Sequence, residues 1–162
     1  MSVRTLTAQD LLDLEHKAAA NPRRRANLNL HGDDSALLHR FVISMCDDSY
    51  VRPHRHREPH KLEMATMLAG AMDWIFFDEQ GRVTQRVRVD AQGPVRAVEV
   101  PPGVFHGVVP VTPSGAFLEV KQGPYVAASD KEFAPWAPAE GSPGSPACLD
   151  WLRRAQAGER YA

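Results

Sequence analysis

The sequence predicts an all-β domain, an antiparallel sandwich or barrel, with a short helix before it and a proline-rich tail after it. Between about residues 25 and 121, apolar and polar side chains alternate with a period of two, and turn residues interrupt the pattern every ~8–12 positions. No helical pattern separates these segments, so consecutive strands are expected to be antiparallel. The length of 162 residues corresponds to a single domain.

The first predicted element is a helix over residues 5–20. Thr7 is a suitable cap for its N-terminus, and one face carries apolar residues at helical spacing, namely Leu11, Leu12, Leu14 and Ala18. Asn21 and Pro22 end the helix, because the residue before a proline disfavours helical dihedral angles. Residues 1–24 therefore form a helix and an arm attached to the domain.

Nine strands are expected in the body of the domain, residues 25–121. They are predicted at 25–31, 36–46, 49–56, 62–69, 71–78, 83–89, 95–100, 105–111 and 116–121. The segment 78–81, Asp-Glu-Gln-Gly, is a hairpin turn, and 92–94 and 112–115 are turns of similar composition.

The last part of the chain, residues 122–162, has a different composition. It holds five of the thirteen prolines, and residues 140–146 read as a linker. A short helix is expected over residues 147–157, with Leu149 and Leu152 as its apolar contacts. Because about forty residues bury too little surface to form a core of their own, we expect a strap across the barrel.

Composition narrows the class of protein. Hydrophobic residues make up 43% and charged residues 24% of the chain, as in globular domains, and the net charge is -1. This balance gives no general reason to bind nucleic acid or an anionic membrane. We find no apolar run of ~18 residues and no secretory signal pattern, and Cys46 and Cys148 lack metal or redox spacing. We expect reduced thiols in a soluble cytoplasmic protein.

Histidines are concentrated in one segment. His54 and His56 project to the same side of a strand, because side chains at i and i+2 share a face. Glu63 begins the next apolar strand, and His106 follows the turn signal Pro101–Gly103. Imidazole and carboxylate groups suit a divalent transition metal such as Zn, Fe, Mn, Ni or Co. The alternative is a solvated basic loop.

The same residues resemble the first motif of the cupin superfamily, which runs Gly, five residues, HxH, three or four residues, Glu, six residues, Gly. The interval from Glu63 to Gly70 agrees with the motif. Two departures occur: Asp48 stands where the first Gly is expected, and six residues separate His56 from Glu63. The long connection also makes His60 an alternative ligand, although Glu63 is favoured because it starts a strand.

The second cupin motif is represented by Gly93 and by Pro101–His106, with Pro110 in place of the usual terminal Asn. The resemblance implies a small antiparallel jelly-roll barrel. It also implies that four side chains converge on one divalent transition metal: His54, His56, Glu63 and His106. A homodimer is a further expectation from the resemblance.

Four separated segments are similar, in order, to the WbuC family of cupin-fold metalloproteins. They are residues 23–31, 50–56, 118–125 and 131–141. Family naming associates these proteins with bacterial surface-polysaccharide gene clusters. The resemblance implies a metal-binding protein that acts on or binds a small polar metabolite, such as a sugar or sugar nucleotide.

Other residues are candidates for a substrate pocket. One face of the strand near residue 25 is polar and is either an edge in water or the wall of a ligand site; it carries Arg25, Asn27, Asn29 and His31. Glu119 and Lys121 share a face and form either an acid–base pair in a cavity or an outward ion pair. Strict alternation places Arg52 beside His54 as a candidate anion-binding residue, and Met67 on the face of Glu63.

Three classes of function follow: a metal-dependent enzyme of isomerase, lyase or oxygenase type, a non-catalytic saccharide-binding module, and a domain with a closed structural metal site. An open coordination position distinguishes the first two from the third. All three predict a small-molecule or metal partner rather than nucleic acid or a membrane. The sequence does not identify the catalytic residues, the metal or the reaction.

Overall fold

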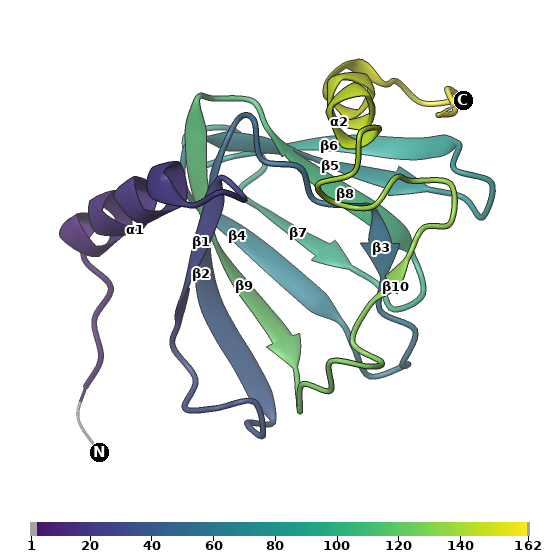
Figure 1. Ribbon diagram of the computed structural model, residues 1–162. Coiled ribbons are helices and arrows are strands. Elements are labelled where there is room, and N and C mark those ends of the chain that lie inside the picture. The colour runs from purple at the N-terminus through teal and green to yellow at the C-terminus, as the bar shows by residue number, and fades with distance from the viewer. Residues whose placement is uncertain (1–2, 162) are drawn as a thin grey trace.

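The computed structural model describes residues 3–161, which form two five-stranded antiparallel sheets that face each other (Figure 1). The first sheet has the order β1-β2-β9-β4-β7, and its strands are Arg25–Asn29, Leu38–Cys46, Ser114–Gln122, Glu63–Ala69 and Ala97–Val100. The second has the order β10-β3-β8-β5-β6, and its strands are Glu132–Phe133, His54–Arg55, Phe105–Pro110, Ala71–Phe77 and Val83–Asp90. The predicted all-β fold is confirmed.

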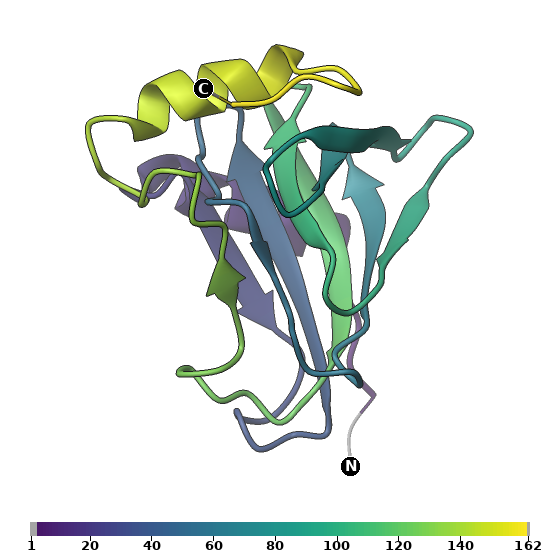
Figure 2. The ribbon, with the colours of Figure 1, turned by 90° about the vertical axis from the view of Figure 1, so that its right-hand side faces the viewer.

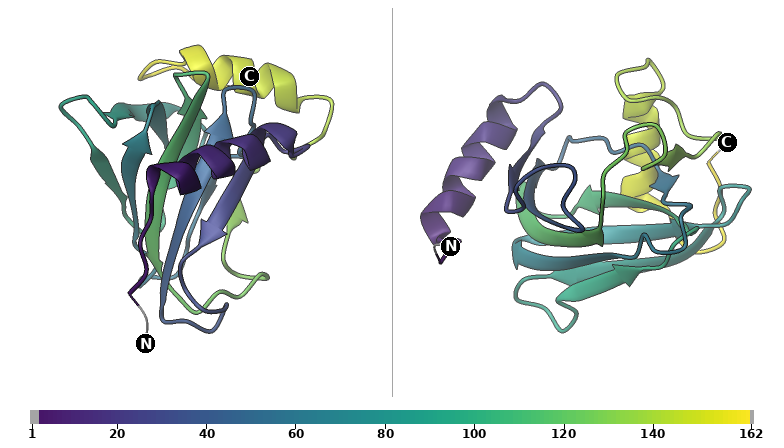
Figure 3. Two further views of the ribbon diagram at one scale, coloured as in Figure 1. Left: turned by 90° about the vertical axis from the view of Figure 1, so that its left-hand side faces the viewer. Right: turned by 90° about the horizontal axis from the view of Figure 1, so that it is seen from below.

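Helices cover the outer faces of both sheets (Figure 3). Helix α1 (Ala8–Ala20) packs Leu14 against Val42 and Ala116 of the first sheet, and its Ala18 is also buried. Its N-terminus has the predicted cap, since Thr7 Oγ1 accepts a hydrogen bond from the backbone N–H of Asp10. None of the helices within residues 3–161 has the length and apolar character needed to cross a membrane.

The C-terminal helix α2 (Ser145–Arg154) lies across the second sheet (Figure 2). Its Leu149 and Leu152 are buried in a cluster with Ile75 and Phe77 of β5. Because this tail covers the outer face and the barrel interior lies on the other side, every residue of β5 is buried. The helix begins two residues before the predicted start and ends three before the predicted end, with Pro146 in its first turn.

Two short strands differ from the prediction. Only His54 and Arg55 of the expected strand 49–56 are strand, because Pro53 cannot donate a ladder hydrogen bond. The tail adds an unpredicted strand, β10, which pairs Phe133 with His54. This pairing places a segment of the tail against the histidine cluster.

Two glycines lie at the ends of the strands that carry Glu63 and His106. Gly70, between β4 and β5, has a φ of 68°, and an added Cβ atom would lie 2.6 Å from the carbonyl oxygen of Ser114. Gly103 has a φ of 80°, as the third position of a type II turn requires. The turn predicted before His106 is therefore present.

Candidate metal centre

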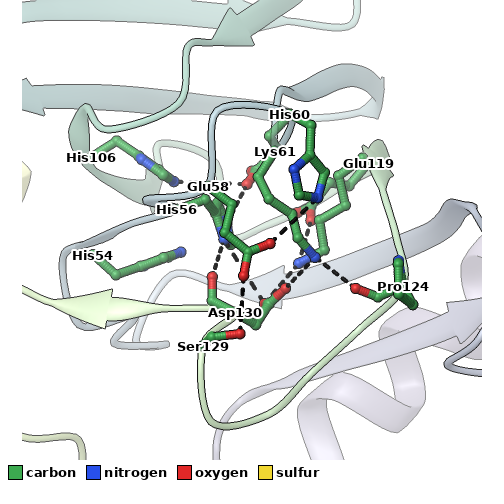
Figure 4. A network of polar contacts seen from close by, with 12 residues as sticks. His54, His56, Glu58, His60, Lys61, His106, Glu119, Pro124, Ser129 and Asp130 are labelled. Atoms are coloured by element: carbon green, nitrogen blue, oxygen red, sulfur yellow. Dashed lines mark hydrogen bonds and ion pairs between the residues drawn. The ribbon is translucent and has the colours of Figure 1, made fainter.

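Three histidines meet inside the barrel. His54 lies in β3 and pairs directly with His106 of β8, while His56 follows β3. All three are at most 5% exposed, and one ring nitrogen of each lies within 4.8 Å of the others. Figure 4 shows the three rings directed toward a common space. The pairing of β3 with β8 thus joins residues that are about fifty positions apart in the chain.

Backbone carbonyl groups orient the three rings. In each ring, Nδ1 lies beside a carbonyl oxygen and must donate to it; the partners are Arg52 for His54, Val104 for His106 and Asp130 for His56. Nε2 of His54 and of His106 therefore carries the lone pair of the neutral ring, and Nε2 of His56 carries one when it does not donate to a carboxylate. Such carbonyl partners to the second nitrogen are typical of histidines that bind metals.

Glu63, the first residue of β4, completes the cluster from the opposite sheet. Its Oε2 lies 3.0 Å from Nε2 of His56 and 3.9 Å from Nε2 of His106. His60 does not join them, because its side chain is 52% exposed and lies 3.3 Å from Glu58. The arrangement brings together His54, His56, Glu63 and His106 and leaves His60 at the surface.

The environment sets the protonation of this cluster. Burial lowers the pKa of His54 well below its ordinary value, with a smaller contribution from the charge of Lys131, and burial also lowers the pKa of His106. Burial alone would raise the pKa of Glu63, but the hydrogen bond from His56 and the charges of His106, His56 and Lys121 lower it to about 2. Neutral imidazoles and an ionised carboxylate are the forms that bind a metal.

One buried nitrogen atom without a hydrogen-bond partner indicates whether a cation fits between these side chains. Nε2 of His106 is buried and has no hydrogen-bond partner among the described residues. An unpaired buried polar atom costs free energy unless a ligand satisfies it. Three imidazole nitrogens and one carboxylate around a common space are a donor set for a divalent transition metal. The residues present therefore fit the metal that the fold implies.

A second layer of charge lies beside the cluster. Glu119 and Lys121 are both buried, with 3.9 Å between Oε1 and Nζ, so they face the interior rather than solvent. Lys121 Nζ donates to Asp130 Oδ2 at 3.1 Å. Lys61 Nζ donates to the carbonyl oxygen of Pro124 at 2.7 Å, and Figure 4 shows these two residues side by side. Burial and the charge of Glu63 raise the pKa of Glu119 to about 8.

A cavity of about 580 Å³ adjoins this layer. Predicted residues line it from β1 and beyond, namely Arg25, Asn27, Asn29 and His31, and Lys121 lines it from β9. Asp130 and Lys131, from the tail, complete the wall next to the metal centre. The polar face of β1 is therefore the wall of a cavity as well as an edge.

Two candidates lie elsewhere. Arg52 donates to the carbonyl oxygen of Ala134 and lies over the ring of Phe133, and it does not line the cavity. Strict alternation failed for Arg52 because residues 50–53 are not a strand. Met67 is buried in the apolar core between the sheets, beside Trp74 and Phe117.

Sequence reasoning missed Lys131 and Asp130. Both belong to the tail, whose composition suggested only packing. The alternation of Lys131, Glu132 and Phe133 is the one local signal for a strand, and it is too short to stand out.

A family model described as "Domain of unknown function (DUF6016)" matches residues 6–89. This segment is more than half of the chain and contains His54, His56 and Glu63. The chain belongs to the DUF6016 family. His106 lies beyond the matched segment of this DUF6016 protein. No curated protein matches the chain.

Solved structures show what the DUF6016 chain resembles in three dimensions. An oxalate oxidase in complex with the substrate analogue glycolate has a TM-score of 0.55 at 16% identity, over 84% of this chain and 69% of that chain. This likeness shows the fold, a cupin jelly-roll barrel.

Two further solved structures are similar over part of the chain. A cupin 2 conserved barrel domain protein from Leptotrichia buccalis has a TM-score of 0.49 at 16% identity, over 64% of this chain and 43% of that chain. An oxalate decarboxylase from Lactobacillus farciminis, in a formate complex, has a TM-score of 0.47 at 19% identity, over 64% of this chain. The DUF6016 chain spans 28% of the length of that decarboxylase.

Proposed function

We propose that the protein binds one divalent transition metal ion through His54, His56, Glu63 and His106, and that this centre binds or converts a small polar ligand. The observation that carries the proposal is the set of three buried rings whose nitrogens lie within 4.8 Å of one another. Their Nδ1 atoms are held by carbonyl groups, and Nε2 of His106 has no other partner in the described part of the chain.

The cavity supports a role in ligand binding over a purely structural metal. A closed structural site needs no adjoining space, whereas about 580 Å³ of cavity adjoins the layer formed by Lys121 and Asp130. A bound divalent metal would supply Lewis-acid polarisation of a ligand oxygen. Asn27 and Asn29 offer amide groups to ligand hydroxyls, and Glu119 offers a carboxyl group that can hold a proton.

For the ligand, we propose a sugar or a sugar nucleotide. The polar lining of the cavity supports this class, and so does the similarity to WbuC-family proteins associated with surface polysaccharide. If the protein is an enzyme, the Lewis-acid chemistry suits an isomerase, lyase or oxygenase reaction. A non-catalytic saccharide-binding module is the alternative, and only turnover distinguishes the two. We further propose a cytoplasmic protein that forms a homodimer.

The test is metal content. Protein purified without chelator and supplied with Zn, Fe, Mn, Ni and Co is expected to retain about one metal per chain, measured by mass spectrometry of the digested sample. The double variant His54→Ala/His56→Ala is expected to retain none, because half of the ligands are lost.

The matched control is His39→Ala, which removes an equally buried histidine outside the centre. It is expected to keep its metal. Full occupancy in the double variant, or loss of metal in the control as well, would contradict the proposal.

A further inference from the structure

Three lysines and three carboxylates lie in or beside the metal centre, and they are not evenly paired. The lysines are Lys61, Lys121 and Lys131, and the carboxylates are Glu63, Glu119 and Asp130. The carboxylate of Asp130 forms ion pairs with two lysines: its Oδ1 lies 3.6 Å from Nζ of Lys61, and its Oδ2 lies 3.1 Å from Nζ of Lys121. Lys121 is also 3.9 Å from Glu119. Lys131 has no ion pair or side-chain hydrogen bond within residues 3–161.

The backbone on either side of Lys131 is tied to the metal centre. The carbonyl oxygen of Asp130 accepts the hydrogen bond from His56, and Phe133 pairs with His54 in the β10–β3 ladder. Lys131 therefore lies between two residues that are fixed against the proposed metal ligands. These backbone hydrogen bonds fix the position of Lys131 relative to the metal centre.

The Lys131 side chain reaches the cavity from the residue just before β10. Glu132 turns outward, where its carboxylate accepts from Nε of Arg55 at 2.8 Å. Phe133, the next residue of β10, lies on the opposite face of the strand. The ring of Phe133 lies 6.3 Å from the ring of His54, and Lys131 lines the cavity. Lys131 is thus an exposed residue whose accessible side includes the cavity.

The net charge of this region determines which kind of ligand the cavity favours. Without a metal, three ammonium groups face three carboxyl groups in this region. A divalent cation adds two positive charges that the chain does not balance, and an ammonium group without a counterion remains beside it. An anionic ligand group that enters the cavity is stabilised by the charge of the metal ion and by the charge of this ammonium group.

We propose that Lys131 binds the anionic group, a carboxylate or a phosphate, of a small polyol ligand that occupies the cavity beside the metal centre. The inference rests on the proposed function, because the metal supplies the excess positive charge. The polyol part faces Asn27 and Asn29, whose amide groups suit hydroxyl groups, across the cavity from the tail. Lys131 is then a specificity residue that the sequence did not reveal.

Three probes that share a six-carbon skeleton test this inference: gluconate, glucose 6-phosphate and glucose. Metal-loaded wild-type protein is expected to bind one or both anions at least about tenfold more tightly than glucose, measured by calorimetry. The anion that binds more tightly identifies the carboxylate or the phosphate as the preferred group. Lys131→Met is expected to lose at least about tenfold in affinity for that anion, and Lys131→Arg is expected to recover most of it.

Arg57→Met is the matched control. It removes one positive charge from the same region, but its side chain is 71% exposed and pairs with Glu132 on the outer face. It is expected to bind the anion as wild type does. Equal affinity of Lys131→Met and wild type, equal loss in both variants, or no preference of wild type for the anions over glucose would overturn the inference.

Metal content, measured on the same samples, separates this result from the proposed function. Lys131→Met is expected to keep the full metal complement, because Lys131 donates no metal ligand. A wild-type protein that holds no metal overturns the proposed function, and the inference falls with it. A wild-type protein that holds metal and shows no anion preference overturns the inference alone.

Discussion

The barrel contains two clusters of buried charge, and they differ in how completely they are paired. In the first, Asp73 of β5 is 2% exposed and pairs with Arg86 and Arg88 of β6. Arg86 also donates to the carbonyl oxygens of Leu152 and Ala155, at the end of α2. This Asp73 cluster faces the helix, and none of its three side chains lines the cavity beside the metal centre.

The metal centre and its lysine layer form the second cluster. Here buried atoms have no hydrogen-bond partner in the described residues, including Nε2 of His106 and Oδ1 of Asp130. The cluster also faces a cavity. The difference teaches that buried charge alone does not mark a functional site. Complete pairing indicates a structural role, whereas orphaned atoms beside a cavity indicate a missing ligand.

The largest effect on stability is expected at the Asp73 cluster. Asp73→Ala should lower the free energy of unfolding by about 3–5 kcal/mol, because it leaves the part-buried guanidinium of Arg86 without its carboxylate. Metal content should not change. Urea denaturation measures the loss, with Asp150→Ala as control, since that exposed carboxylate pairs with Arg153 at the surface. A decrease in the free energy of unfolding of less than about 1 kcal/mol would show that the Asp73 cluster contributes little to stability.

A smaller effect, on metal affinity, is expected at the metal centre. Glu63→Gln should weaken metal binding at least about tenfold, or about 1.4 kcal/mol, because the charged oxygen ligand is lost. His60→Ala should bind as wild type does, since His60 pairs with Glu58 at the surface. Competition with a metal-sensitive dye measures both affinities. Weaker metal binding by His60→Ala, together with unchanged binding by Glu63→Gln, would show that His60 and not Glu63 is the metal ligand.

The smallest effect is expected at a third cluster with the same composition as the Asp73 cluster. Glu140 accepts from Arg23 and Arg25, and 32% of its side chain is exposed. Burial alone would raise the pKa of Glu140, but hydrogen bonds from both arginines lower it from 4.5 to about 2. Solvent screening reduces the contribution, so we expect Glu140→Gln to cost about 1 kcal/mol.

The pH dependence of this third variant follows from the sign of the shift. A carboxyl group whose pKa is lower in the folded state stabilises the protein above its unfolded pKa. The advantage of wild type over Glu140→Gln should therefore be complete above about pH 4.5 and should disappear as the pH falls toward 2. Thermal unfolding of both proteins between these limits measures it. A difference that does not change with pH would contradict the ion-pair explanation.

Local patterns predicted much of the fold. Period-two alternation located eight of the nine expected strands closely, and Thr7 and Gly103 have the predicted cap and turn conformations. The prediction was weakest where strands were short. The segment 49–56 contains a proline that breaks its ladder, and β10 has only two residues, too few to show a period.

The sequence by itself determined the strand periodicity, the outer helix and the pattern of His54, His56, Glu63 and His106, because spacing within a strand fixes which side chains share a face. Only the tertiary structure decided which residues surround them. It placed His60 at the surface, turned Glu119 and Lys121 inward, moved Arg52 onto Phe133 and brought Lys131 from the tail to the cavity. The physical reason is that these contacts join segments far apart in the chain, where no local periodicity records which faces will meet.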